Sequence, residues 1–226
     1  MSLLDKYKAV IFDWDGTIVD TCGLILDSHN HVRQKYGQPL WTQDDFLNND
    51  GPRSTREYYP EIFKEDSDQA IIDLYDYIET HHLNYLEPLE GAFNLLDAFD
   101  VPIGLVSNKR HSTLMKEVIH LGVEEKFSCI VGAGQAERDK PAADPLLMGI
   151  ELLPTDVSLD EVLFVGDTQT DLLCAKNAGV DVVFLQNDRA RPDLIEKYAP
   201  KLHFMSTNGF YLFVEEQKEQ KTSKIA

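Results

Sequence analysis

Cysteine is scarce in this chain: three stand among 226 residues, Cys22, Cys129 and Cys174, and none belongs to a CxxC pair. A small and odd number of cysteines argues against a disulfide scaffold and indicates reduced thiols. Long apolar runs are also missing, since none approaches the roughly 20 residues of a membrane-spanning helix. The first residues lack the apolar core of a signal peptide. We therefore expect a cytoplasmic protein that binds no membrane.

Positive charge is the second shortage, with 21 Lys and Arg against 39 Asp and Glu and a formal net charge of −18. Nucleic-acid binding without sequence preference needs clustered Lys and Arg, and docking on anionic lipid needs a basic surface. The composition argues against both kinds of partner. A small anionic substrate stays open, because a few local cations and a metal override the net field.

Short apolar runs rich in Val, Ile and Phe are typical of buried parallel strands. They are Ala9–Phe12, Ile103–Val106, Cys129–Val131, Val162–Val165 and Val182–Leu185. Helical patterns separate the later runs, at Ser112–Leu121, Pro145–Leu153 and Thr170–Ala178. This alternation predicts an α/β fold with a doubly wound parallel sheet, a Rossmann-like core.

The stretch between Thr17 and Pro88 contains no such run, and its apolar residues recur at helical spacing, as in Ile71, Leu74 and Ile78. We expect a small α-helical cap at residues 20–87, inserted into a catalytic core of residues 1–19 and 88–214. The polar residues 215–226 predict a disordered tail.

The first apolar run ends at a pair of carboxylates in Val-Ile-Phe-Asp-Trp-Asp-Gly-Thr, residues 10–17. Asp13 and Asp15 would repel each other unless a cation or a transferable proton lay between them. An exposed Asp-x-Asp-Gly turn is the plainer interpretation. Other polar groups follow later strands, however, and ligands of open parallel sheets bind beyond the carboxyl ends of the strands.

Four motifs in this order resemble those of the haloacid dehalogenase-like superfamily of hydrolases, and more narrowly its phosphoglycolate-phosphatase type with a helical cap after the first motif. They are Asp-Trp-Asp-Gly-Thr at 13–17, Ser107-Asn108, Lys140-Pro141 and Gly166-Asp167-Thr168-Gln169-Thr170-Asp171. The resemblance covers about residues 8–205.

The resemblance implies roles for the catalytic residues. Asp13 would be the nucleophile that forms an aspartyl-phosphate, and Asp15 would be the general acid and base. Ser107 would hydrogen-bond the phosphoryl oxygens, although a Ser before a helix also serves as an N-cap. Lys140 would neutralise charge that develops on the phosphoryl group and hold Asp13 ionised.

The resemblance also implies a Mg²⁺ site, because this cation prefers hard oxygen ligands. The ligands would be Asp13, the Asp15 main-chain carbonyl, Asp167 and Asp171, the last directly or through water. Asp171 has an alternative, since an Asp at a helix N-terminus is stabilising without any metal.

Substrate contacts are expected from Thr17, Asn108 and Arg53. Thr17 would brace the first loop, and Asn108 would bind phosphoryl oxygens. Arg53 follows a Gly51-Pro52 turn and would meet a second polar group of the substrate, unless it is simply solvated.

The function implied is a Mg²⁺-dependent phosphatase acting on a small phosphorylated metabolite, as a monomer or homodimer. A sugar phosphomutase of the same superfamily is the enzymatic alternative, and a non-catalytic binding protein with this fold is the other. The presence of Asp15 argues against dehalogenation, because dehalogenases of the superfamily lack that carboxylate. The sequence leaves the substrate open.

Overall fold

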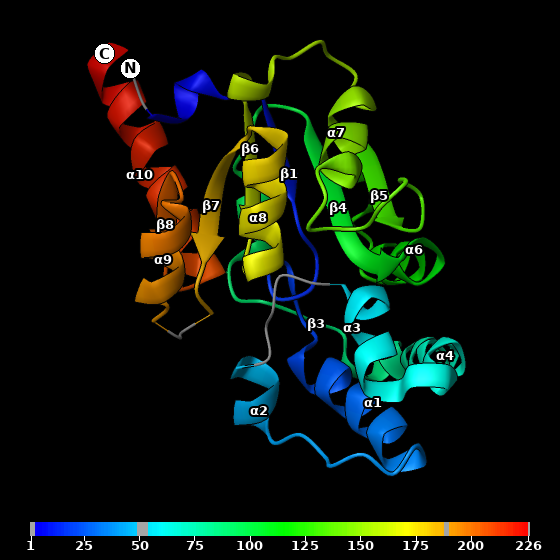
Figure 1. Cartoon of the computed structure of the whole chain (residues 1–226). Coiled ribbons are helices and arrows are strands. Elements are labelled where there is room, and N and C mark those ends of the chain that lie inside the picture. Colours follow the sequence, from blue (N-terminus) through cyan, green and yellow to red (C-terminus); the bar gives the residue numbers. More distant parts are fainter. Residues whose placement is uncertain (1–2, 49–53, 188–189, 226) are drawn as a thin grey trace.

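A six-stranded sheet in the order β5-β4-β1-β6-β7-β8 forms the centre of the molecule (Figure 1). The computed structural model describes residues 3–48, 54–187 and 190–225. The strands are β1 Ala9–Phe12, β4 Ile103–Arg110, β5 Cys129–Ala133, β6 Val162–Gly166, β7 Asp181–Leu185 and β8 Leu202–Phe204. Neighbouring strands are parallel throughout. The doubly wound α/β fold is confirmed, and β8 is a strand that the sequence did not predict.

β1 lies between β4 and β6, where the chain's strand order reverses. Its four residues are fully buried, and alternate side chains enter two separate hydrophobic clusters. Val10 and Phe12 belong to one cluster, while Ala9 and Ile11 belong to the other. This period of two is what a pleated strand imposes when helices cover both of its faces.

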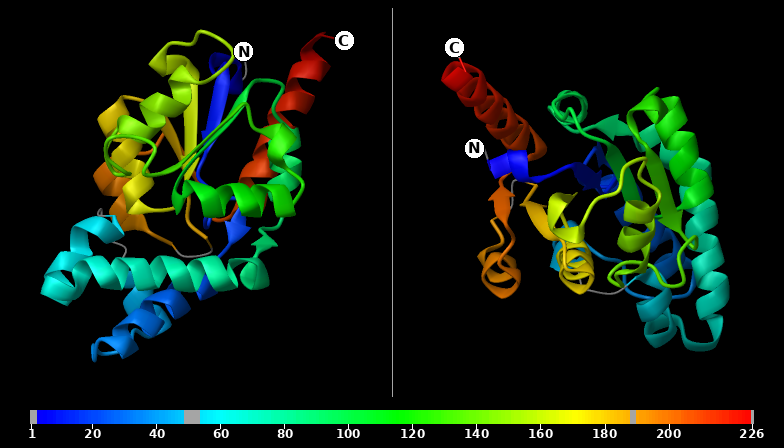
Figure 2. Two further views of the ribbon diagram at one scale, coloured as in Figure 1. Left: turned by 90° about the vertical axis from the view of Figure 1, so that its right-hand side faces the viewer. Right: turned by 90° about the horizontal axis from the view of Figure 1, so that it is seen from above.

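Helices cover both faces of the sheet, as Figure 2 shows. On the Phe12 face lie α5 Ala92–Asp97, α6 His111–His120 and α10 Thr207–Ile225; on the other lie α7 Asp144–Glu151, α8 Gln169–Ala178 and α9 Pro192–Tyr198. Short 3-10 helices span Leu3–Lys6, Lys64–Asp66, Glu124–Lys126 and Leu159–Glu161. Within the described residues, every helix is too short or too polar to cross a membrane.

Four more helices lie together beyond one end of the sheet (Figure 1). They are α1 Cys22–Lys35, α2 Gln43–Asn48, α3 Thr55–Phe63 and α4 Ser67–Tyr85, which we call the helical insert. The insert has its own hydrophobic cluster, built around Val32, Tyr59, Phe63 and Leu74. Helices therefore occupy this stretch as the apolar spacing predicted.

The chain enters and leaves the helical insert through two short strands that pair with each other. β2, Val19–Asp20, is antiparallel to β3, Glu87–Pro88. The Leu89 N–H also donates to the Ile18 carbonyl at 2.9 Å. Both crossings between the sheet and the insert therefore lie side by side.

The C-terminal residues differ from the prediction of a disordered tail at 215–226. They continue α10 as far as Ile225. The helix is anchored upstream by Phe210 and Val214, which are buried in the main core. Further along, the Lys221 ammonium pairs with Asp5 at 2.8 Å. Polar composition predicted a disordered tail, whereas the structure records a helix whose earlier residues Phe210 and Val214 pack in the core.

Candidate active site

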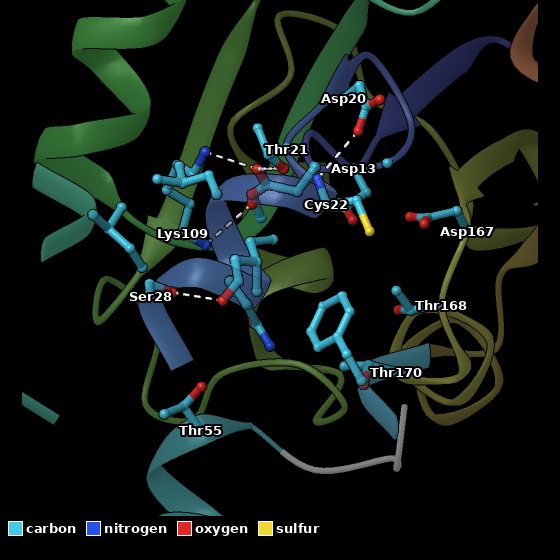
Figure 3. Close-up of a pocket in the computed structure, with 18 of the residues that line it drawn as sticks. Asp13, Asp20, Thr21, Cys22, Ser28, Thr55, Lys109, Asp167, Thr168 and Thr170 are labelled. Carbon is cyan, nitrogen blue, oxygen red and sulfur yellow. Dashed lines mark hydrogen bonds and ion pairs between the residues drawn. The ribbon is translucent and has the colours of Figure 1, made fainter. Parts of the chain in front are cut away.

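A cavity of about 790 Å³ lies between the carboxyl ends of the strands and the helical insert. Among the predicted residues it is lined by Asp13, Asp15, Ser107, Asn108, Lys140 and Asp167. Figure 3 shows the Asp167 carboxylate directed toward Asp13, with Ser28 and Thr55 of the insert across the opening. Arg53 lies outside the described residues.

The register of the sheet explains this convergence. Phe12 is paired with Leu105 on β4 and with Val165 on β6. The polar residues that follow these three strands must therefore emerge at nearly the same level. In an open parallel sheet this edge, at the reversal of strand order, is where ligands bind.

The Lys140 ammonium lies at the floor of this site, between two carboxylates. Lys140 is only 2 % exposed. Its Nζ lies 2.7 Å from Asp13 Oδ1 and 2.6 Å from Asp171 Oδ1, and it donates to the Val106 carbonyl at 3.1 Å. Burial alone lowers the pKa of an ammonium, but these two carboxylates outweigh burial and raise the pKa of Lys140. Lys140 is therefore a permanent buried cation.

Opposing electrostatic influences act on the pKa of the Asp13 carboxyl group. Burial is the largest influence and, with repulsion from Asp171, it raises the pKa of Asp13 to about 7, while Lys140 acts in the opposite direction. A second cation nearby would favour the ionised form of Asp13. Burial and the Asp171 carboxylate therefore oppose the ionised form of Asp13, whereas Lys140 favours it.

Asp13, Asp167 and Asp171 form a cluster that could hold a metal ion, with one potential ligand atom from each lying within 4.8 Å of the others. Three carboxylates face one ammonium, so two negative charges remain for a divalent cation to neutralise. All-oxygen donors match the preference of Mg²⁺. The residues present thus fit such an ion in both charge and donor type.

Gly16 is required where the first loop passes Asp167. A Cβ at this position would lie 2.2 Å from Asp167 Oδ2, and the backbone φ is +74°, in the left-handed region. A side chain there would meet both a steric clash and backbone strain. Glycine after Asp15 therefore lets Asp167 approach the end of β1.

Asp171 lies in the first turn of α8 and also contacts Lys140. Its Oδ2 accepts hydrogen bonds from the backbone N–H and the hydroxyl of Thr168, at 3.0 and 2.6 Å. In return the Thr168 hydroxyl accepts from the Asp171 N–H at 3.2 Å. This reciprocal capping box satisfies donors at the start of the helix. The helix-start role raised for Asp171 is thus present, alongside its place in the acidic cluster.

Two predicted substrate-binding residues, Thr17 and Asn108, form hydrogen bonds that support the loops of the site. Thr17 is fully buried, is absent from the cavity lining and donates to Asp167 Oδ1 at 3.3 Å. The Asn108 side chain donates to the Lys140 carbonyl at 2.8 Å and accepts from the Lys140 N–H at 2.9 Å. Thr17 therefore braces a carboxylate of the acidic cluster, and Asn108 fixes the backbone that carries Lys140.

Asp15 is attached to a second buried ammonium that sequence reasoning missed. Its Oδ1 accepts hydrogen bonds from the Thr21 hydroxyl at 2.5 Å and from Lys109 Nζ at 2.7 Å. Lys109 also donates to both oxygens of Glu117, at 2.8 and 2.7 Å. Burial lowers the pKa of Lys109, but Asp15 and Glu117 outweigh it and raise that pKa.

Glu117 is fully buried and collects donors from three parts of the chain. Besides Lys109, it accepts from the Trp14 indole N–H at 2.6 Å and from His82 Nδ1 at 2.9 Å. His82 belongs to α4 of the insert, so this carboxylate joins the insert to the loop that carries Asp15. The signal that could have found it is a charged residue on the apolar face of α6, beside Leu114.

His29 of α1 is buried in the insert wall of the cavity. Its Nδ1 forms a hydrogen bond with the Tyr59 hydroxyl at 2.8 Å. Burial first, and the nearby Arg33 guanidinium second, lower the pKa of His29 to about 3. The imidazole is therefore neutral at physiological pH and offers no positive charge to a ligand.

Known proteins resemble this chain in sequence and in fold. The sequence profile of the haloacid dehalogenase-like hydrolases matches residues 10–185. The pyrophosphatase PpaX of Halalkalibacterium halodurans is 27 % identical over 198 residues, 86 % of this chain and 91 % of that protein.

Solved structures share the fold at lower identity. A haloacid dehalogenase-like family hydrolase from Streptococcus pneumoniae superposes with a TM-score of 0.77 at 17 % identity, covering 92 % of this chain and 99 % of that one. A predicted phosphoglycolate phosphatase from Haemophilus somnus gives 0.74 at 19 % identity, covering 92 % and 98 %.

Replacing Glu117 tests the buried network. We expect Glu117→Ala to lower the free energy of unfolding by about 3–5 kcal/mol, because a buried ammonium loses a partner. Urea denaturation measures this. The matched control is Glu125→Ala, an exposed position, where a change within about 0.5 kcal/mol is expected. A loss from Glu117→Ala as small as that of the control would contradict the network's importance.

His29 should make stability depend on pH. The unfolded chain takes up a proton near its usual pKa of about 6.5, whereas the folded protein resists until about pH 3. Between these values the unfolded state binds more protons, so stability falls as pH falls, by up to about 1.4 kcal/mol per pH unit.

His29→Gln removes this contribution, so the variant should gain on the parent protein as pH falls below 6.5. Urea unfolding at several pH values gives the comparison. His120→Gln, at an exposed position, controls for loss of a histidine. Parallel curves for His29→Gln and the parent would show that His29 titrates normally.

Proposed function

The chain belongs to the haloacid dehalogenase-like hydrolase family, and we propose that it is a Mg²⁺-dependent phosphatase acting on a small phosphorylated metabolite. The observation that carries the proposal is Lys140, buried between Asp13 and Asp171 beside Asp167. A cationic floor under a carboxylate suits attack on a phosphate, because it compensates charge on both groups.

Asp13 is proposed as the nucleophile. Its backbone N–H donates to the Val165 carbonyl at 2.8 Å, which fixes the residue at the end of β1. An Asp13 oxygen attacks phosphorus, the bond from phosphorus to the leaving oxygen breaks, and an aspartyl-phosphate forms. Water then attacks the same phosphorus and releases Asp13 and inorganic phosphate.

Asp15 is proposed to move the proton in both steps. It donates a proton to the leaving oxygen and later accepts one from the attacking water. Its carboxylate is 18 % exposed and is held by Thr21 and Lys109. These contacts keep Asp15 at the cavity, two residues from the nucleophile.

Phosphate recognition is assigned to Ser107 and Lys140, both of which line the cavity. The Ser107 hydroxyl accepts from the Lys109 N–H at 3.1 Å, which leaves its own proton to donate to a phosphoryl oxygen. Lys140 opposes negative charge on that group. Asn108 acts with them by fixing the backbone of Lys140.

Asp13, Asp167 and the Asp15 main-chain carbonyl are proposed to hold Mg²⁺, with Asp171 behind them. When bound, this cation supplies positive charge that polarises the phosphoryl group. Thr17 and Asn187 orient Asp167 for the task, donating to its two oxygens at 3.3 and 2.8 Å.

Two substrates are worth testing first. Pyrophosphate is suggested by the name of the PpaX relatives, and phosphoglycolate by the name of the predicted phosphoglycolate phosphatase that shares the fold. Both are small phosphorylated compounds within the proposed class.

Asp13→Asn tests the nucleophile. An amide has nearly the same shape but no anionic oxygen, so phosphate release should fall at least about 1,000-fold while the fold persists. Phosphate release from p-nitrophenyl phosphate and circular dichroism measure both. Asp193→Asn, an exposed residue of α9, is the matched control. Turnover by Asp13→Asn close to that of the control would remove Asp13 from its proposed role.

Binding of Mg²⁺ can be measured from protein stability, without an activity assay. If the acidic cluster binds Mg²⁺, saturation at about 100 times the dissociation constant should stabilise the fold by about 2.7 kcal/mol. Thermal unfolding with EDTA or Mg²⁺ measures the effect. Asp167→Ala should weaken it more than Asp171→Ala, whose carboxylate already serves Lys140 and Thr168. Unfolding that ignores Mg²⁺ would contradict the metal site.

A further inference from the structure

We propose that the preferred substrate is a phosphate monoester whose leaving group carries a flat, uncharged ring, bound by the insert wall of the cavity. This inference rests on the proposed phosphatase function and names its substrate class. It comes from the size of the cavity, the side chains of that wall and the placement of charge around it.

The cavity is much larger than a phosphoryl group requires. Its volume of about 790 Å³ falls within the range of roughly 300–1,000 Å³ that holds drug-sized ligands. The phosphoryl group would occupy the end formed by Asp13 and Lys140. The remaining space extends to the insert and is available to a sizeable leaving group.

The insert contributes a wall of rings to this space. Its ring wall is defined by His29, Trp41, Phe46 and Tyr58, with the aliphatic Leu24 and Ile25 beside them, and all six residues line the cavity. The His29 ring centroid lies 5.2 Å from that of Trp41, 6.1 Å from Phe46 and 6.2 Å from Tyr58. Trp41 and Phe46 keep part of their surface exposed. Such surfaces bind a planar ring by stacking or edge contact.

The ring wall contains no positive charge. Its imidazole, His29, has a pKa lowered to about 3 by burial and by Arg33. Arg33 itself lies behind the wall: its Nε donates to the Pro39 carbonyl, and its guanidinium carbon lies 4.5 Å from the Trp41 ring centroid. Among the residues that the structure describes, this wall offers no cation, so a carboxylate or second phosphate placed here would lose hydration without compensation, which is costly.

The cations that line the rest of the cavity, within the described residues, are Lys109, Lys140, Arg56 and Arg110. The two lysines are buried against carboxylates. Arg56 pairs with Asp139 at 3.5 Å, and the Arg110 guanidinium lies 4.4 Å from the Tyr75 ring centroid. Positive charge is thus concentrated at the phosphoryl end and along the sides, where Arg56 is ion-paired and Arg110 lies against the Tyr75 ring. The ring wall is left for a neutral group.

An aryl or arylalkyl phosphate and a nucleoside monophosphate share the required chemistry. The test compares kcat/KM within two matched pairs, one member with a ring and one without. Benzyl phosphate is paired with ethyl phosphate, and adenosine monophosphate is paired with ribose 5-phosphate. Pyrophosphate and phosphoglycolate provide the anionic leaving groups.

We expect a ratio of at least tenfold in favour of the ring in one pair, and the pair identifies the source of the ring. Trp41→Ala and Phe46→Leu should each reduce that ratio by at least about fivefold, the lower end of the range for base stacking on an aromatic side chain. Phe46→Leu keeps apolar bulk, so it guards against a general loss of folding. Trp41→Phe should restore part of the ratio. Tyr77→Ala, an insert aromatic outside the cavity lining, should leave it unchanged.

Ratios near one in both pairs would overturn the inference, as would a tenfold preference for pyrophosphate or phosphoglycolate over every ring-bearing ester. Both results leave the phosphatase proposal standing if hydrolysis depends on Asp13. Absence of Asp13-dependent hydrolysis of all six compounds and of p-nitrophenyl phosphate would instead overturn the phosphatase proposal and the inference with it.

Discussion

Asp13 and Asp171 lie close together in the interior because a single ammonium, that of Lys140, lies between them at 2.7 and 2.6 Å. Removing one member of such a buried set leaves an uncompensated charge, which costs several kcal/mol. The three residues come from the end of β1, the loop before α7 and the start of α8. The sheet and helices around the site must therefore pack so that these three residues stay in contact. Asn108 contributes by fixing the backbone that carries Lys140.

The same physical rule operates a second time, at Lys109. Its ammonium is shared by Asp15 and Glu117, and Glu117 also accepts from His82 of the insert. A fully buried carboxylate needs several donors, and here those donors come from elements on both sides of the cavity. The position of the helical insert and the orientation of Asp15 are therefore set within one network rather than independently.

The distribution of charge gives the cavity two different ends. A chain with a net charge of −18 places two buried ammonium groups under the carboxylates, so local cations oppose the overall field where an anion would bind. At the other end, burial keeps His29 neutral among aromatic rings. The proposed phosphate chemistry and the proposed recognition of the leaving group therefore fall to different parts of the chain.

The sequence by itself determined the elements whose signals are local. Ala9–Phe12 forms β1 with the bounds predicted, and the pattern of strands and helices implied the sheet whose edge gathers Asp13 and Asp167. Only the tertiary structure decided the contacts between distant residues, such as Lys109 with Asp15, 94 positions away, and Trp14 with Glu117, 103 away. The strand β8 has three residues and no fully buried side chain, so it too could be recognised only from the tertiary structure. The sequence of a short or charged segment does not indicate which distant residue it will contact. The stability of that contact depends on burial and on the opposite charge that the fold brings beside it.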